Sequence, residues 1–224
     1  MLFRSTLCVS TQVGCAMACA FCATGTLGLS RDLSAGEIVA QVHTAATWAG
    51  VSRFDRLVFM GMGEPLHNYT ATRDALHVLL EPRGAGFGSK SIAVSTVGLP
   101  ARMRRFAGDF GGRVGLALSL HAGTDDTRRR ILPAARATSL AELKQVLLDH
   151  PLPGSRALML EVVALPGVND TPTELEGIAA FAHGLRAIVN LLPFNPFPGA
   201  PFRSPRPDEV TSMALALKAL GAPV

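Results

Sequence analysis

Aromatic and charged side chains are both scarce in this chain of 224 residues. Aromatic residues make up 6%, with one Trp and one Tyr, and Asp, Glu, Lys and Arg together make up 17%. So few rings argue against a nucleic-acid-binding module that stacks bases on aromatic side chains. No motif of the common RNA-binding modules is present either. A purely RNA-binding, non-catalytic role is therefore disfavoured.

Long hydrophobic runs are also absent. No stretch approaches 18 consecutive apolar residues, the length at which a membrane-spanning helix is considered. Residues 1–14 contain no long apolar core before a small-residue cleavage site, so they do not resemble a secretory signal. We therefore expect a cytoplasmic protein without a membrane partner.

What the chain does contain is enough apolar material for a sizeable core. Hydrophobic residues make up 48%, which excludes a disordered or low-complexity chain. The formal net charge is +4 although few residues are charged. A basic, rather apolar surface suits a nucleic-acid partner and a hydrophobic patch that something else covers. A modestly basic enzyme with a small-molecule substrate fits the charge equally well.

The four cysteines are clustered near the N-terminus, and none follows Cys22. A disulfide framework would scatter its cysteines, whereas clustered thiols in a reducing compartment indicate a metal site. The spacing Cys15-x3-Cys19-x2-Cys22 puts three thiolates in one loop. Three thiolates suit a [4Fe–4S] cluster in which one iron lacks a protein ligand. Structural zinc, with Cys8 as a fourth ligand, is the alternative.

An iron without a protein ligand can be chelated by the amino and carboxylate groups of S-adenosylmethionine (SAM). An electron from the cluster then cleaves the sulfonium and yields a 5′-deoxyadenosyl radical, chemistry that the cofactors supply. The loop Ala23-Thr24-Gly25 directly after the third cysteine supports this interpretation. Phe21 fits either packing against the bound nucleoside or cluster, or ordinary core packing.

Apolar, β-branched runs alternate with helical patterns along the chain. Strands are predicted at residues 7–10, 56–60, 91–95, 114–120, 157–163 and 188–192. Helices are predicted at residues 34–49, 69–80, 100–106, 125–132 and 140–149, from 172 onward, and at 207–220. Six strands, each followed by a helix, imply a parallel sheet with right-handed crossovers. We therefore predict an α/β fold, an open (β/α)6 partial TIM barrel, as a single domain over residues 1–224.

Unusual polar residues follow the predicted strands at their C-terminal ends, where parallel barrels bind ligands. They are the cysteine loop, Gly63 and Glu64, Ser95, Ser119 to His121, Asn169, and Asn195. The Gly61-x-Gly63 turn would let backbone approach a ligand, and Glu64 could accept a hydrogen bond from the methionine ammonium. Neutral hydrogen bonds to ribose, carboxylate or adenine are expected from three side chains: Ser95, Ser119 and Asn195. His121 could do the same or be a satisfied rim histidine.

A charged segment, Asp125, Asp126 and Arg128 to Arg130, opens one predicted helix. We interpret it as a solvated helix start, with contact to phosphate as the alternative.

Several motifs together resemble the radical SAM adenine methyltransferases of the RlmN/Cfr type, over nearly the whole chain. They are Leu7 to Cys15, the CxxxCxxC motif, Gly61 to Leu66, Val94 to Gly98, Leu118 to Ala122, and Leu192 to Gly199. The resemblance implies methylation of carbon 2 of an adenine in 23S rRNA, and often in tRNA. A Cfr-like enzyme would methylate carbon 8 instead. Another radical SAM enzyme, one that only cleaves SAM reductively, is the remaining alternative.

The resemblance also implies roles for individual residues. The cluster would be held by Cys15, Cys19 and Cys22. SAM would be contacted by Gly63, Glu64, Ser95, Ser119, Leu120, His121 and Asn195. In the family, one SAM methylates a cysteine near the C-terminus, and a second SAM yields the radical that makes this methyl group add to adenine. The cysteine matching Cys8 then attacks the carrier sulfur, forms a disulfide and releases the methylated base.

Two departures from the family pattern matter. The carrier cysteine lies on a final strand and tail, and this sequence stops at Val224, where that strand should begin. The N-terminal helical domain of the family is absent too. We therefore expect the cluster- and SAM-binding core, able to bind the cluster and to cleave SAM but not to complete methyl transfer. A flavodoxin-like one-electron reductant and a monomeric state are expected as well.

Overall fold

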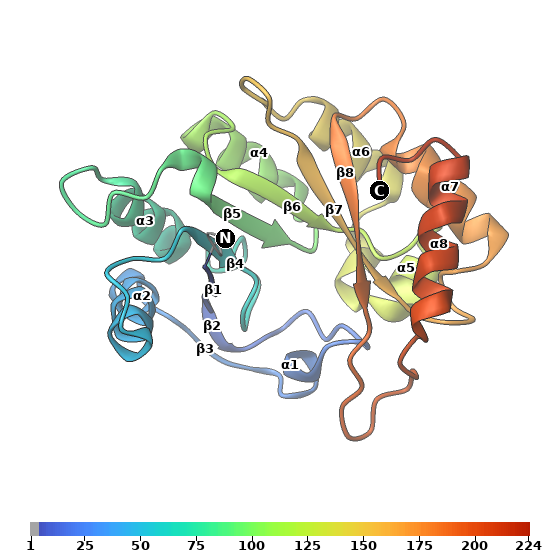
Figure 1. The fold of residues 1–224 in the computed structure, drawn as a ribbon, viewed down its shortest axis with the longest axis horizontal. Coiled ribbons are helices and arrows are strands. Elements are labelled where there is room, and N and C mark those ends of the chain that lie inside the picture. The colour runs from blue at the N-terminus through green and yellow to red at the C-terminus, as the bar shows by residue number, and fades with distance from the viewer. Residues whose placement is uncertain (1–4) are drawn as a thin grey trace.

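Six parallel strands form one curved sheet in the computed structural model, which describes residues 5–224 (Figure 1). Residues 1–4, part of the stretch compared with secretory signals, lie outside it. The strands, in their order across the sheet, are β1 (Thr6–Cys8), β4 (Arg56–Phe59), β5 (Ile92–Thr96), β6 (Gly115–Ser119), β7 (Leu158–Ala164) and β8 (Ala187–Pro193). Every neighbouring pair is parallel. The two edge strands, β1 and β8, do not pair with each other, so the predicted open (β/α)6 architecture is confirmed.

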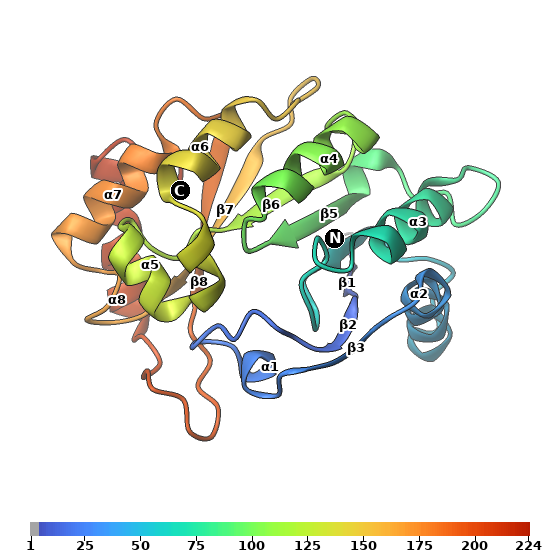
Figure 2. The same ribbon diagram turned by 180° about the vertical axis from the view of Figure 1, so that it is seen from behind.

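The helices connect the strands and cover the outside of the curved sheet (Figures 1 and 2). They are α2 (Ala35–Ala49), α3 (Tyr69–Leu80), α4 (Pro100–Phe110), α5 (Asp125–Ile131), α6 (Leu140–Leu148), α7 (Pro172–Ala182) and α8 (Pro207–Ala219). Two short 3-10 turns, Ser89–Ser91 and Pro133–Ala137, complete the connections. Among the described residues, no helix combines the length and the apolarity needed to cross a bilayer.

Side-chain alternation along the strands separates the two faces of the sheet. In β5, Ile92 and Val94 are buried in the main hydrophobic cluster, where they meet helix residues such as Leu76. Ala93 and Ser95 are half-buried and point to the other face. Because successive strand residues alternate in direction, this pattern turns the hydroxyl of Ser95 toward the concave side of the half-barrel.

The segment that carries the cysteines has structure that the sequence analysis did not predict. The strand predicted at residues 7–10 ends at Cys8, and a second strand, β2 (Gln12–Gly14), follows it. β2 pairs antiparallel with β3 (Leu29–Asp32), so the cysteine loop and the one-turn helix α1 (Ala23–Thr26) are enclosed by a hairpin. These strands are too short for a hydrophobic period, and long-range hydrogen bonds fix them instead.

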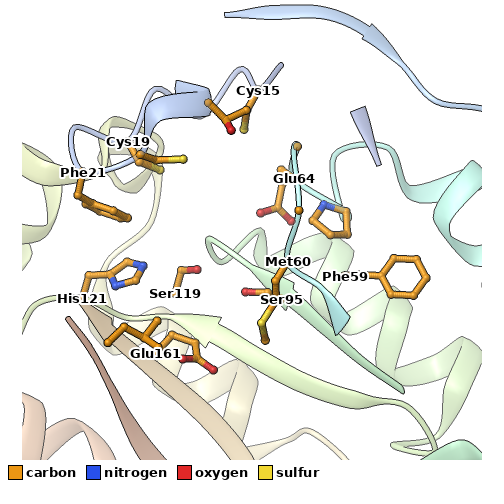
Figure 3. A pocket seen from close by; sticks show the side chains of 16 residues that line it. Cys15, Cys19, Phe21, Phe59, Met60, Glu64, Ser95, Ser119, His121 and Glu161 are labelled. Carbon is orange, nitrogen blue, oxygen red and sulfur yellow. The ribbon is translucent and has the colours of Figure 1, made fainter. Parts of the chain in front are cut away.

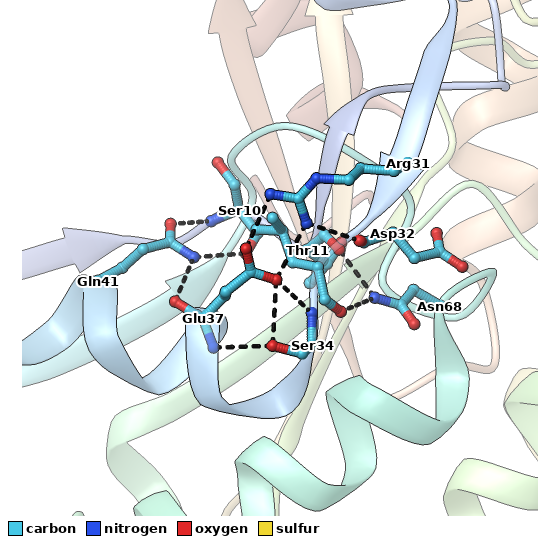
Figure 4. Close-up of polar contacts among 9 residues, drawn as sticks. Ser10, Thr11, Arg31, Asp32, Ser34, Glu37, Gln41 and Asn68 are labelled. Atoms are coloured by element: carbon cyan, nitrogen blue, oxygen red, sulfur yellow. Dashed lines mark hydrogen bonds and ion pairs between the residues drawn. The ribbon is translucent and has the colours of Figure 1, made fainter.

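Polar side chains anchor the base of this hairpin to α2 and α3 (Figure 4). The Asn68 amide, at the start of α3, donates to the carbonyls of Thr11 and Leu33, at 2.8 and 2.7 Å. Gln41 of α2 accepts from the N–H of Ser10 and donates to its carbonyl, both at 2.9 Å. The cysteine loop therefore starts from a position fixed by two helices.

Helix α4 extends further than predicted. The pattern suggested an end near residue 106, but the helix continues to Phe110, which is buried against Phe106. Gly108 is accommodated within the helix. The left-handed Gly111, with φ of 55°, ends it, as glycine commonly does after a helix C-terminus.

Candidate functional site

A cavity lies at the C-terminal ends of the central strands, beneath the cysteine loop (Figure 3). Thiols border it on one side, and polar side chains of the strand ends border it on the other. The lining includes Cys15, Cys19, Phe21, Cys22, Gly61, Gly63, Glu64, Ser95, Ser119, His121 and Glu161. The sequence thus predicted most of the polar lining residues, which come from segments far apart in the chain.

The three loop cysteines are free thiols that line this one cavity. No three His, Cys, Asp or Glu side chains within residues 5–224 are close enough together to hold a single metal ion. In a [4Fe–4S] cluster each cysteine binds a different iron, so its sulfurs lie farther apart than around one zinc ion. Three thiols of one loop on one cavity are a donor set that fits a [4Fe–4S] cluster with one iron left without a protein ligand. Burial raises the pKa of Cys19 to about 12, so binding a metal must release a proton.

Backbone and ring contacts hold the cysteine loop over the cavity. The N–H of Cys15 donates to Gly28 at 2.8 Å, and the N–H of Ala20 donates to the carbonyl of Ile131 in α5 at 2.9 Å. The ring of Phe21 meets the ring of His121 edge-on, with centroids 4.4 Å apart. Phe21 packs against the second hydrophobic cluster, so core packing is confirmed. It also lines the cavity, and packing against a bound nucleoside or cluster stays a prediction.

Glu64 is buried at the turn after β4, with 3% of its surface exposed. One carboxylate oxygen accepts from the N–H of Leu66 at 2.9 Å, and the other accepts from the N–H of Val97 at 2.8 Å. Burial raises the pKa of Glu64 to about 7. The carboxylate thus joins the end of β5 to the turn after β4 and also borders the cavity.

Glycine at position 63 has a packing reason in addition to the predicted one. Its φ is +101°, and an added Cβ would lie 2.5 Å from the Cβ of Gln12. An added Cβ at Gly61 would likewise meet the carbonyl of Val9, at 2.8 Å. Both glycines therefore allow the turn to pack on the segment after β1. Both also line the cavity, so the approach of a ligand to their backbone stays a prediction. Gln12 accepts from the N–H of Glu64 at 2.8 Å and completes this contact.

Ser95 and Ser119 end adjacent strands and present hydroxyl groups to the cavity. Neither hydroxyl has a hydrogen-bond partner within the described part of the chain, and both residues are partly exposed. Two neutral groups that can donate or accept are thus available to a ligand.

His121 follows β6 in a left-handed conformation, with φ of 61°, and is 5% exposed. Its Nδ1 accepts from the N–H of Val163 at 3.1 Å, which assigns the proton to Nε2. Burial lowers the pKa of His121 to about 3, with a smaller effect from the nearby Arg128 cation. His121 therefore offers the cavity a neutral N–H donor.

Three predicted site residues lie elsewhere. Leu120 is fully buried in the main core, and its N–H donates to the carbonyl of Glu161 at 3.0 Å. Asn195 is exposed in the loop after β8 and does not line the cavity. Cys8 is exposed on the edge strand β1, in a groove beside α2. Burial of its sulfur raises the pKa of Cys8, and a hydrogen bond from the N–H of Met60, a cavity residue, opposes this.

Arg128 is not part of a solvated helix start, contrary to expectation. It is fully buried, and its guanidinium donates to the carbonyls of Val97 at 2.6 Å, Ser119 at 3.0 Å and Leu120 at 3.1 Å. These carbonyls lie at the ends of β5 and β6, so the side chain satisfies backbone groups that have no sheet partner there. Only the next two arginines, Arg129 and Arg130, are exposed. Asn169 is also fully buried, and it too bonds backbone rather than facing the cavity.

Glu161 is the main cavity residue that the sequence analysis missed. It lies in β7, within the apolar run Leu-Met-Leu-Glu-Val-Val-Ala. A carboxylate in the middle of a buried strand is costly unless it is paired or functional. This isolated charge was the signal that could have identified it.

Comparisons with known proteins identify the family of this chain. The radical SAM superfamily profile matches residues 9–179. The chain is 44% identical over 216 residues to the "Dual-specificity RNA methyltransferase RlmN" of Syntrophobacter fumaroxidans, covering 96% of this chain and 63% of the relative. It is 46% identical to the protein of that name from Anaeromyxobacter dehalogenans, covering 92% and 57%. The chain thus spans about three fifths of the length of these relatives.

Solved structures show the same fold. A radical SAM methyltransferase from Sphaerobacter thermophilus is 42% identical, with a TM-score of 0.92 over 100% of this chain and 66% of that one. SuiB of Streptococcus suis shares the fold at 11% identity, with a TM-score of 0.64 over 96% of this chain and 47% of that one. With three thiols and a rim of hydrogen-bonding groups around one cavity, the chain belongs to the radical SAM superfamily.

Proposed function

We propose that this chain is the cluster- and SAM-binding domain of an RNA methyltransferase that methylates carbon 2 of an adenine in 23S rRNA and in tRNA. The observation that carries the proposal is the placement of Cys15, Cys19 and Cys22 on one cavity with the hydrogen-bonding strand ends. The similarity to proteins named dual-specificity RNA methyltransferases supports RNA as the substrate class.

Each of the three cysteines would bind one iron of a [4Fe–4S] cluster and leave the fourth iron for SAM. The bound cluster and SAM together supply a one-electron reductive cleavage of the sulfonium, which ordinary side chains cannot perform. The chain itself binds and orients. Glu64 can accept one further hydrogen bond, from the methionine ammonium, because each carboxylate oxygen has two acceptor sites. Ser95, Ser119 and His121 would hold the rest of the cofactor.

Cys8 is proposed as the thiol that resolves a covalent link to the methyl carrier. Its exposure on an edge strand makes it accessible to a second sulfur. The N–H of Met60 donates to its sulfur, and Met60 also lines the cavity. The four cysteines are all free thiols in the structure, so a disulfide requires a further cysteine or a rearrangement. We further propose a flavodoxin-like reductant, a monomer and a cytoplasmic location, in keeping with the net charge of +4 and an RNA partner.

Anaerobic reconstitution with iron and sulfide tests the cluster. We expect about four irons per chain and broad absorption near about 400 nm. Cys15→Ala, Cys19→Ala and Cys22→Ala should each remove most of this iron, whereas Cys8→Ala should keep it. A colourless protein, or one that takes up only zinc, would contradict the proposal.

Product analysis then separates the candidate reactions. Reconstituted protein, SAM, reduced flavodoxin and transcripts of 23S rRNA or tRNA are incubated, and nucleosides are identified by mass spectrometry. Methylation at carbon 2 supports the proposal. Methylation at carbon 8 favours a Cfr-like enzyme. Release of 5′-deoxyadenosine without RNA methylation is the outcome expected of a core that binds the cluster and SAM but does not complete methyl transfer.

A further inference from the structure

A buried carboxylate with an unused oxygen lies at the side of the cavity opposite the thiols (Figure 3). Glu161 of β7 is 4% exposed. Its Oε2 accepts from the side-chain amide of Asn190 at 2.8 Å, and Asn190 lies beside it in the register of β7 and β8. Its Oε1 is buried and has no partner among the described residues. Few native polar atoms are left in this state, so the oxygen needs an explanation.

The carboxylate serves no evident structural purpose. A glutamine at position 161 would accept the hydrogen bond of Asn190 equally well. An unpartnered buried charge, by contrast, lowers stability. Consistent with this cost, burial raises the pKa of Glu161, and the hydrogen bond from Asn190 only partly opposes the change. A residue that costs stability and borders the functional cavity is typical of a ligand-binding group.

The two cavity glutamates differ in whether both carboxylate oxygens already accept a hydrogen bond from the protein. Both oxygens of Glu64 already hold backbone amides, from Leu66 and Val97. Glu161 keeps one oxygen free, and Ser119 lies directly beside it across β6 and β7. In Figure 3, Cys15 and Cys19 border one side of the cavity and Glu161 the other, with Ser119 between them. Glu161 therefore meets the part of a ligand that lies farthest from the cluster.

We propose that Glu161 is a ligand-binding residue for the ribose of SAM, with Oε1 accepting a hydrogen bond from a ribose hydroxyl. This inference rests on the proposed function, in which the methionine end of SAM faces the cysteines and the nucleoside extends away from them. A carboxylate that accepts from a ribose hydroxyl is a common device in dinucleotide-binding folds. The hydroxyl of Ser119 can accept or donate beside it. Asn190 acts as a positioning residue, because it holds the carboxylate in place through Oε2.

Binding measurements with modified nucleosides test this contact. The anaerobically reconstituted protein is titrated with SAM and with its 2′-deoxy and 3′-deoxy analogues, using isothermal calorimetry. For the unmodified protein, we expect removal of the bonded hydroxyl to weaken binding about ten- to hundredfold, as for a hydrogen bond to a charged group. In Glu161→Leu, SAM should bind more weakly, and the difference between SAM and that analogue should fall below about threefold. In Glu161→Gln, a neutral amide replaces the charged acceptor, so the difference should fall at least about threefold below that of the unmodified protein. Glu142→Gln, on the far helix α6, is the control and should behave like the unmodified protein.

The outcomes separate two kinds of failure. If the unmodified protein binds SAM but both Glu161 variants discriminate against the deoxy analogues as it does, the ribose contact is wrong and the proposed function stands. If the reconstituted protein binds no SAM, the proposed function fails and this inference fails with it. Thermal unfolding of each variant shows whether it is folded, and Glu161→Gln, which keeps the side-chain shape, decides the case if Glu161→Leu unfolds.

Discussion

At the scale of single residues, Arg128 shows how a buried cation can be structural. Its guanidinium bonds three carbonyls at the ends of β5 and β6, where the strands stop pairing. No carboxylate makes an ion pair with it in the described chain, and burial lowers the pKa of Arg128 to about 10. The side chain therefore joins the backbone just behind Ser95 and Ser119 and fixes the spacing of the two hydroxyls.

Replacing this residue should be costly. Arg128→Met removes the side-chain donor from the carbonyls of Val97, Ser119 and Leu120, of which the Leu120 carbonyl keeps the N–H of Ala122. We therefore expect the free energy of unfolding to fall by about 2–4 kcal/mol. Urea unfolding followed by circular dichroism measures this. Arg130→Met, on the exposed face of the same helix, should change stability by less than about 0.5 kcal/mol. Equal effects of the two substitutions would contradict the structural role.

The sequence predicts the helix that carries Arg128 but does not show that this side chain is buried. The run of three arginines predicted a helix start correctly, and α5 begins at Asp125 as expected. Which arginine turns inward depends on carbonyls from two strands that lie 9 and 31 residues away from it. Glu161 was missed for the related reason that its partner, Asn190, belongs to the next strand.

At the scale of elements, two helix glycines differ in their surroundings. Gly177 of α7 faces the carbonyl of Gly123, which an added Cβ would overlap. Gly108 of α4 is exposed, and an added Cβ would meet nothing within 4 Å. The first glycine permits a close approach of α7 to the turn after β6, and the second has no packing reason.

Alanine should therefore act in opposite directions at the two positions. Gly177→Ala forces α7 away from the turn, and we expect it to destabilise the protein by about 1–3 kcal/mol. Gly108→Ala should stabilise the protein by about 0.5–1 kcal/mol, because alanine is the better helix former and loses less backbone conformational entropy on folding. Urea unfolding of both variants provides the comparison. Destabilisation by Gly108→Ala would show that α4 is packed differently.

Elements with a clear period were predicted well, and those held by distant contacts were not. Helix α3 matches its predicted bounds, because apolar residues recur along its 12 positions. The β2–β3 hairpin was missed because its strands have three and four residues, too few for alternation to show. Its base is held by hydrogen bonds with the side chains of Asn68 and Gln41, which lie far from it in the sequence.

At the scale of the whole molecule, stability should depend on pH through buried groups outside the cavity as well as in it. His150, after α6, is 6% exposed, and both ring nitrogens lack partners in the described chain. Burial lowers the pKa of His150 to about 4. Because the unfolded chain takes up this proton near pH 6.5, the stability contributed by the neutral ring is present above pH 6.5 and is lost as the pH falls through about 4.

The direction of this pH dependence can be measured by replacing His150. Relative to the unmodified protein, His150→Leu should be more stable at pH 5 than at pH 7.5 by about 1–2 kcal/mol, since the variant has no ring to protonate. His150→Gln should show the same pH difference even if its stability at pH 7.5 differs. Urea unfolding of the metal-free protein at both pH values gives the answer, and a pH-independent difference would rule out a buried neutral ring.

The cysteine loop is held over the cavity from several directions. Its ends and its middle are held by backbone and side-chain hydrogen bonds to α2, α3 and α5. The thiols span eight consecutive residues, while the groups opposite them come from four separate strands. Hydrogen bonds at both ends and in the middle of the loop thus present the three thiols to the cavity from a defined position, opposite side chains that are themselves fixed by the sheet.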